Sequence, residues 1–184
     1  MEKLLINTKR LQIRNLCPAD LENFYAYRSN PEVTKYQGFD TMTLAQCEHF
    51  IQGQKNKLFG QPGDWVQYGI EEVSLQKLIG DCAVKMDLYD SRLAEIGITI
   101  SHLYQQQGYA KEAISGILNF IFGVKNLHRV TATVDAENTA SINLMKSIGF
   151  RQEAYYVENI FFNGKWGSEI LFAMLHREWR EISR

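Results

Sequence analysis

The stretch that decides the fold runs from Glu95 to Glu112 and reads EIGITISHLYQQQGYAKE. In its first six residues, isoleucines alternate with Glu95, Gly97 and Thr99. This alternation predicts a strand with one apolar face and one small, polar face. A polar loop follows, and apolar residues then recur at the spacing of a long amphipathic helix: Ala113, Ile114, Ile117, Leu118 and Ile121.

The loop between this strand and helix is a candidate phosphate site. The first turn of a helix presents free N–H groups with a partial positive charge, and Gly108 lets a ligand approach the backbone closely. Ala110 keeps the next position small, and Lys111 adds a positive charge. The alternative is a glycine that only ends one element and starts the next. The loop matches neither GxxxxGK[ST] nor GxGxxG, so nucleotide hydrolysis and a Rossmann site lose support.

Working outward, the periodicity predicts a mixed α/β fold with one central sheet. Strands are expected at residues 9–14, 65–71, 78–86, 95–100, 129–134 and 167–175, with one more before a hairpin turn at Asn163 and Gly164. A first helix is expected after Pro18, and Asn30 and Pro31 are expected to end it. A second helix should follow the capping box of Thr43 and Gln46. Further helices are expected after Gly108, after Asn138 and at 177–182. The short links within residues 65–100 favour antiparallel neighbours.

Length and composition narrow the class of protein. The 184 residues are expected to form a single domain, 1–184, and 45% hydrophobic with 22% charged residues is typical of a folded protein. A net charge of -1 argues against a nucleic-acid binder, and no apolar run reaches the length of a membrane span. The three cysteines and four histidines are scattered, which predicts reduced thiols in a cytoplasmic protein and no metal site. The apolar run within residues 1–7 is too short for a signal peptide, so none is expected.

Two motifs give the chain a family resemblance. Gln105-x-x-Gly108-x-Ala110 matches the Q/R-x-x-G-x-G/A acyl-CoA signature of the GNAT N-acetyltransferase superfamily, and residues 138–150 resemble its N-x-x-[AS]-x-x-[LV]-x-x-x-x-G-F segment. Further fragments resemble its RimJ/RimL-like branch: Thr8-Lys9-Arg10-Leu11-x-x-Arg14, Pro18-x-Asp20, residues 29–33, residues 94–97 and Glu178-Trp179. The resemblance covers nearly the whole chain. It implies the GNAT fold, a mixed and mostly antiparallel sheet that splays at the CoA site.

The chain departs from the family pattern at two positions. Many relatives have a glycine where this chain has Gln106, so a side chain there is expected to narrow the phosphate loop. Many also place a tyrosine, as general acid for the CoA thiolate, at the position of Met145. The resemblance offers Ser141 as the replacement.

The implied reaction transfers an acetyl group from acetyl-CoA to a primary amine by direct attack in a ternary complex. Glu95 is the candidate base, acting through water, and Ser141 is the candidate hydrogen-bond donor to the thiol sulfur. The alternatives are a cross-strand or surface carboxylate and an ordinary serine of a first helical turn. The resemblance implies cofactor contacts by Ile98, Ile100, Gln105, Gln106, Gln107, Gly108, Tyr109, Ala110, Lys111, Asn138, Ser141 and Asn143, with no metal.

The acceptor stays open between a protein N-terminal α-amine, slightly favoured by the branch, and a small-molecule amine. Tyr25, Tyr27, Arg28 and Tyr36 are expected either to roof the acceptor site or to belong to the core, and Trp65, Trp166 and Trp179 to pack. A homodimer through the hairpin at Asn163 is compatible with the sequence. Two other classes remain: a non-catalytic acyl-CoA-binding or regulatory domain, and an interaction domain without a cavity beside Gly97.

Overall fold

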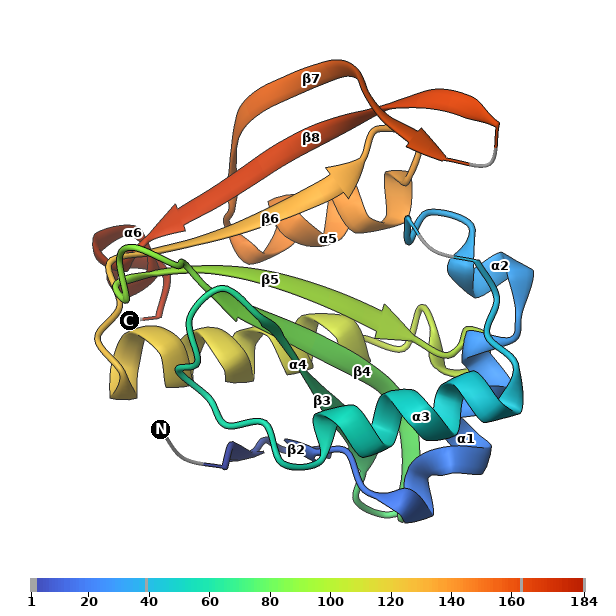
Figure 1. Ribbon diagram of the computed structural model, residues 1–184. Helices are drawn as coiled ribbons and strands as arrows, with labels where there is room; N and C mark the ends of the chain where they lie inside the picture. Colours follow the sequence, from blue (N-terminus) through green and yellow to red (C-terminus); the bar gives the residue numbers. More distant parts are fainter. Residues whose placement is uncertain (1–2, 39, 163, 184) are drawn as a thin grey trace.

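One eight-stranded sheet runs through the molecule, in the order β1-β2-β3-β4-β5-β6-β8-β7 (Figure 1). This computed structural model describes residues 3–38, 40–162 and 164–183. The strands are β1 (Leu5–Asn7), β2 (Leu11–Asn15), β3 (Trp65–Glu72), β4 (Lys77–Met86), β5 (Leu93–Ile100), β6 (Arg129–Asp135), β7 (Arg151–Phe162) and β8 (Lys165–Leu175). The main helices are α1 (Leu21–Arg28), α2 (Pro31–Thr34), α3 (Leu44–Gln54), α4 (Tyr109–Leu118), α5 (Thr139–Ile148) and α6 (His176–Ile182).

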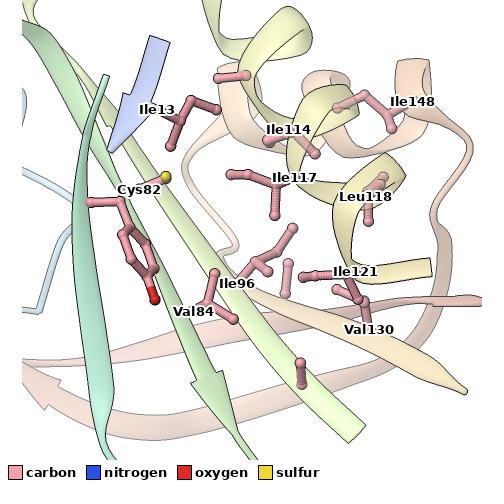
Figure 2. Packing of buried hydrophobic residues seen from close by; sticks show 14 of the residues in the cluster. Ile13, Cys82, Val84, Ile96, Ile114, Ile117, Leu118, Ile121, Val130 and Ile148 are labelled. Atoms are coloured by element: carbon pink, nitrogen blue, oxygen red, sulfur yellow. The ribbon is translucent and has the colours of Figure 1, made fainter. Parts of the chain in front are cut away.

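The large core lies between one face of the sheet and α4. Ile117 of α4 is almost fully buried, and it belongs to one cluster with Val84 of β4, Ile96 of β5 and Val130 of β6 (Figure 2). This is the apolar helix stripe and the isoleucine strand face that the sequence predicts. Each buried aliphatic side chain contributes roughly 1.5–3 kcal/mol by leaving water, so the strand before Gly108 and the helix after it are held together strongly.

The sheet opens at one junction, and this opening positions the site. All neighbouring strands are antiparallel except β5 and β6, which run parallel. These two pair at only three positions, from Leu93 with Arg129 to Glu95 with Thr131. Beyond Glu95 the two described strands no longer pair. The predicted mixed, mostly antiparallel sheet with a splayed junction is thereby confirmed.

The N-terminal segment differs from the prediction in two places. The strand expected at 9–14 begins at Leu11, because the N–H of Thr8 donates to the Leu11 carbonyl and closes a turn (2.9 Å). The turn leads back to β1, which pairs antiparallel with β2 and which the sequence analysis missed. Three residues are too few to show an alternation.

Pro31 starts a helix as well as ending one. The first helix ends at Arg28, and α2 begins at Pro31, with the Asn30 side chain accepting a hydrogen bond from the N–H of Glu32 (3.0 Å). Proline is well tolerated in the first helical turn, where its missing N–H has no partner to lose. The turn predicted at Asn163 lies outside the described residues. The last strand begins at Lys165, earlier than predicted.

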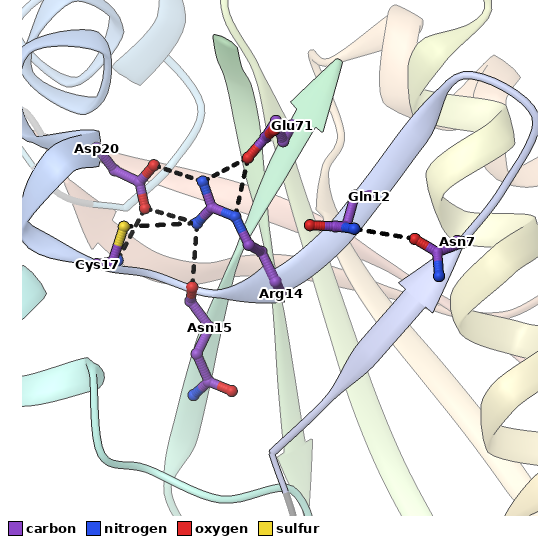
Figure 3. A network of polar contacts seen from close by, with 7 residues as sticks. All are labelled: Asn7, Gln12, Arg14, Asn15, Cys17, Asp20 and Glu71. Carbon is purple, nitrogen blue, oxygen red and sulfur yellow. Dashed lines mark hydrogen bonds and ion pairs between the residues drawn. The ribbon is translucent and has the colours of Figure 1, made fainter. Parts of the chain in front are cut away.

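A polar cluster joins β2 to the start of α1 (Figure 3). Arg14 makes two hydrogen bonds of 2.8 Å to Asp20 and also binds Glu71 of β3. The backbone N–H of Cys17 donates to the same Asp20 carboxylate (2.8 Å). Arg14 and Asp20, which the family resemblance singled out, are therefore part of the scaffold.

Candidate active site

The opening between β5 and β6 leads into a cavity of about 1280 Å³. Residues from the segments 35–38 and 40–50 and from strands β7 and β8 contribute to its walls, together with residues of β3, β4, β5 and β6. A Cβ added at Gly97 would meet no atom within 4 Å, so the space beside this glycine is open. Cavities for drug-sized ligands span roughly 300–1,000 Å³, so this one has room for a cofactor arm and an acceptor together. The alternative of an interaction domain without a cavity beside Gly97 is wrong.

Glu95 lies in the cavity wall at the point where the strands separate. It faces Thr131 in the last residue pair of β5 and β6. The hydroxyl of Thr133, on the same face of β6, donates to Glu95 Oε1 at 3.0 Å. Glu95 is half-buried. It therefore has both features weighed from the sequence, a cross-strand contact and a place in the cavity.

Ser141 and Asn138 reach the cavity from the start of α5. The Asn138 side chain accepts a hydrogen bond from the N–H of Ser141 (3.1 Å), which confirms its predicted place as the helix N-cap. The Ser141 hydroxyl donates to no described residue. Met145 lies one turn further on, also in the cavity wall, and its thioether cannot supply a proton.

The loop before α4 follows β5, whose residues 95–99 line the cavity, and it has an unusual backbone. Both Gln106 (φ +59°) and Gly108 (φ +81°) are in the left-handed region. A left-handed φ is strained for glutamine and free for glycine, so the backbone at position 106 suits glycine better than Gln106. The N–H groups of residues 106–108 donate to no described residue. Such a run of free N–H groups at a helix start fits a phosphate.

Glutamine side chains secure this loop to the end of β5. Gln105 Nε2 donates to the carbonyl of Ile100 (3.0 Å), and Gln107 Nε2 donates to the carbonyl of Leu103 (3.1 Å). Ile100 is buried, and its side chain does not line the cavity. The ammonium of Lys111 contacts the carbonyl of Ser147 at the far end of α5 (3.0 Å).

Arg10 supports the loop from the opposite end of the chain. Its guanidinium donates to the carbonyl of Gln107 (3.1 Å), pairs with Glu112 (2.7 Å) and lies 4.1 Å from the centre of the Tyr109 ring. Thr8 donates to the same Glu112 carboxylate (2.6 Å). Ninety-seven residues separate Arg10 from Gln107, so no local pattern indicates this contact.

The structure thus divides the predicted residues into three groups. Glu95, Ile98, Asn138 and Ser141 meet in the cavity wall. The loop after β5 and the start of α4, which lie outside the cavity wall, contain Gln105, Gln106, Gln107, Gly108, Tyr109, Ala110 and Lys111. Ile100 and Asn143 line neither, and Asn143 is exposed on α5.

The rest of the cavity wall differs in several residues from the sequence-based prediction. Trp65 and Trp166, expected to pack, are 39% and 59% exposed, and Trp65 lines the cavity. Trp179 packs against Phe122 as expected. Of the four candidates for a roof, Arg28 and Tyr36 line the cavity, while Tyr25 and Tyr27 do not. Gln67 on β3 and Ala83 on β4 were missed because their alternation with core residues looks the same as that of any half-buried strand.

The charge of the cavity wall is mainly negative. It contains five carboxylates, Asp40, Glu95, Asp135, Glu137 and Glu169, against the three basic side chains Arg28, Lys35 and Lys165. Arg28 is neutralised by the fully buried Asp81, which lies behind it. Burial alone would lower the pKa of Arg28, but Asp81 outweighs it and the pKa is raised, so Arg28 stays charged and paired. The wall therefore attracts cations.

Within residues 3–38, 40–162 and 164–183, no group of three or more His, Cys, Asp or Glu side chains is placed to hold a metal ion. In the same part of the chain, no helix is long and apolar enough to cross a membrane.

Comparison with known proteins agrees with this geometry. Residues 10–151 match the acetyltransferase (GNAT) domain. The chain is 33% identical over 178 residues to YnaD of Bacillus subtilis, an uncharacterized N-acetyltransferase, covering 95% of this chain and 98% of that one. It is 25% identical to a spermidine N(1)-acetyltransferase of Vibrio cholerae, over 85% of this chain and 88% of the relative. A GNAT-family acetyltransferase of Bacillus anthracis superimposes with a TM-score of 0.85 at 28% identity, over 95% of this chain and 100% of that structure.

Proposed function

Because the chain belongs to the GNAT acetyltransferase family and is an acetyl-CoA-dependent N-acetyltransferase, we propose that its acceptor is a small molecule with a primary amine and further positive charge. The observation that carries this proposal is the excess of carboxylates in the cavity wall around Glu95. An acidic wall raises the local concentration of a cation and offsets the cost of removing it from water. The likeness to a spermidine N(1)-acetyltransferase supports it.

A second acceptor class has support of its own. The N-terminal fragments that resemble the RimJ/RimL-like branch favour a protein α-amine. Two of those residues, Arg14 and Asp20, bind each other, so they serve the scaffold and add nothing to the choice of acceptor. We therefore place the small cationic amine first.

The proposed roles follow from what each side chain can reach. Acetyl-CoA supplies the activated acetyl group as a thioester. Glu95, held by Thr133, accepts the proton of the ammonium through water and leaves the amine free to attack. A backbone N–H near Ile98 stabilises the negative charge that develops on the carbonyl oxygen. The Ser141 hydroxyl, which has no described partner, donates a hydrogen bond to the thiolate.

The free N–H groups of the loop before α4 would hold the pyrophosphate of CoA. This proposal rests on the left-handed residues Gln106 and Gly108 and on the start of α4. Asn138 would bind the pantetheine arm while it caps α5. Because backbone groups carry most of this binding, a protein with almost no net charge can hold a polyanionic cofactor.

An acceptor screen with detection of free thiol tests the proposal. Purified protein and acetyl-CoA are incubated with cationic amines, with neutral amines and with peptides that have free N-termini. We expect thiol release with cationic amines first. Turnover of peptides alone would contradict our choice of acceptor, and turnover of any amine would exclude the non-catalytic alternative.

Two kinds of variant complete the test. Ala110→Trp should abolish acetyl-CoA binding, as measured by calorimetry, because an indole at the first turn of α4 covers the free N–H groups. Ser141→Ala should lower kcat and leave the affinity for CoA almost unchanged. An unchanged kcat would show that Ser141 is an ordinary helix serine.

A further inference from the structure

A row of residues leads from the open junction of the sheet toward β3. Gly97 of β5 is paired with Ala83 of β4, and Ala83 is paired with Gln67 of β3, so the three positions share one face of the sheet. All three line the cavity. The two small residues leave a trough, and Gln67 stands at its end. Since strands lie about 4.8 Å apart, Gln67 is on the order of 10 Å from Gly97 across the sheet.

The orientation of the Gln67 amide is fixed by Asp81, which lies two residues before Ala83 on β4 and on the same face of the sheet. This carboxylate is fully buried and accepts hydrogen bonds from Tyr27 (2.7 Å), from Arg28 and from Gln67 Nε2. An ionised carboxylate only accepts hydrogen bonds, so the amide must present its nitrogen to Asp81. The carbonyl oxygen of Gln67 is then directed away from Asp81.

This carbonyl oxygen has no partner within the described part of the chain. Gln67 is only partly buried, and it lines the cavity. Its Oε1 is therefore an oriented acceptor at the end of the trough. The side chain cannot rotate to offer its nitrogen without breaking the bond to Asp81, and a buried carboxylate that loses a donor is costly.

We propose that Gln67 is a specificity-determining residue, whose carbonyl oxygen accepts a hydrogen bond from a second N–H group of the acceptor while its first amine reacts near Glu95. The inference rests on the proposed function and narrows it. It selects acceptors with two nitrogen donors separated by a flexible chain that fits over Gly97 and Ala83. Monoamines of the same length fill the trough and leave Gln67 without a partner.

The test compares the binding of pentylamine and cadaverine, which differ by one terminal amine. Calorimetry on CoA-saturated protein should show that cadaverine binds the wild type roughly ten-fold more tightly, as expected for one hydrogen bond to a charged group. Gln67→Met keeps the length of the side chain and removes the carbonyl. It should abolish most of this preference and leave pentylamine binding unchanged.

Tyr27→Phe is the matched control. It also removes one hydrogen bond to Asp81, but Tyr27 does not line the cavity. The variant should keep the preference for cadaverine. If Tyr27→Phe loses the preference as Gln67→Met does, or if Gln67→Met weakens both amines equally, the inference is wrong, because the effect then comes from the network behind the wall.

The test of Gln67 and the test of the proposed function can fail independently. CoA binding and thiol release with any amine test the acetyltransferase, whichever diamine binds. Equal binding of pentylamine and cadaverine to wild-type protein that releases thiol would overturn the role of Gln67 alone.

Discussion

Thr133 shows how much depends on a single hydroxyl. This hydroxyl donates to Glu95 Oε1 across the gap between β5 and β6 (3.0 Å). The sequence shows the alternation that places Glu95 on a polar strand face. It does not show that Thr133 is the partner of Glu95, because no local pattern gives the register between strands whose facing residues are 38 positions apart.

Thr133→Val is therefore expected to lower kcat about ten-fold with little change in the affinity for CoA. The variant keeps the shape of the side chain and loses the donor, so the Glu95 carboxylate is no longer held in one place. Thr133→Ser, which keeps a hydroxyl, should restore most of the rate. Steady-state kinetics on both variants, with Glu95→Gln as the reference for full loss of the base, provide the measurement. Equal rates for Thr133→Val and the wild type would show that the Thr133 hydroxyl does not contribute to catalysis.

At the scale of elements, the strand, loop and helix from Glu95 onward could be predicted in detail. The contacts that hold the loop in place from the β1–β2 hairpin could not. Periodicity places β5, α4 and their common core, since each repeats its pattern over several residues. Arg10 supports the loop from β1–β2, and that hairpin contains a strand of only three residues. Short elements and distant contacts are the parts that a local pattern cannot show.

Arg10→Ala should weaken acetyl-CoA binding by roughly ten-fold and leave kcat at saturation nearly unchanged. The substitution removes the hydrogen bond to the Gln107 carbonyl and the ion pair with Glu112, so the loop is less ordered before CoA binds. Ordering this loop on binding then costs more conformational entropy, which weakens the affinity. Calorimetry with CoA measures the effect. Lys9→Ala, at the neighbouring position in the same turn, is the matched control and should bind as the wild type does. A loss of kcat without a loss of affinity would contradict this role.

At the scale of the whole molecule, the Arg14–Asp20 pair makes stability depend on pH. Burial alone would raise the pKa of Asp20, but hydrogen bonds from Arg14 and from the N–H of Cys17 outweigh it and the pKa is lowered. The folded state therefore releases this proton more readily than the unfolded chain. Its contribution is complete above the unfolded pKa near 3.9 and is lost as the pH falls through the lower folded value.

Asp20→Asn should therefore destabilise the protein by about 2 kcal/mol at pH 7, with a smaller difference from the wild type at pH 3. Urea unfolding at both pH values measures this. Asp64→Asn, at an exposed carboxylate, is the control and should change little at either pH. A difference for Asp20→Asn that does not shrink on acidification would show that shape, and not charge, holds the cluster together.

The whole-molecule fold was predictable because one sheet and one long amphipathic helix carry most of the core. On the side that we propose for CoA, the candidate site was open to prediction, because the loop at 105–108 and the start of α5 at 138–141 are each a contiguous run of sequence. The acceptor side was not, because Gln67, Trp65 and Glu169 come from three strands and look like ordinary strand residues until the sheet brings them together.

The short junction between β5 and β6 also has a mechanical meaning. Only three residue pairs couple the half-sheet β1–β5 to the half-sheet β6-β8-β7. If the two half-sheets rotated about this junction, the width of the far end of the cleft would change more than the geometry near Glu95. A cofactor lying between the two strands would act as a strut, setting the spacing at which the acceptor meets the reactive thioester.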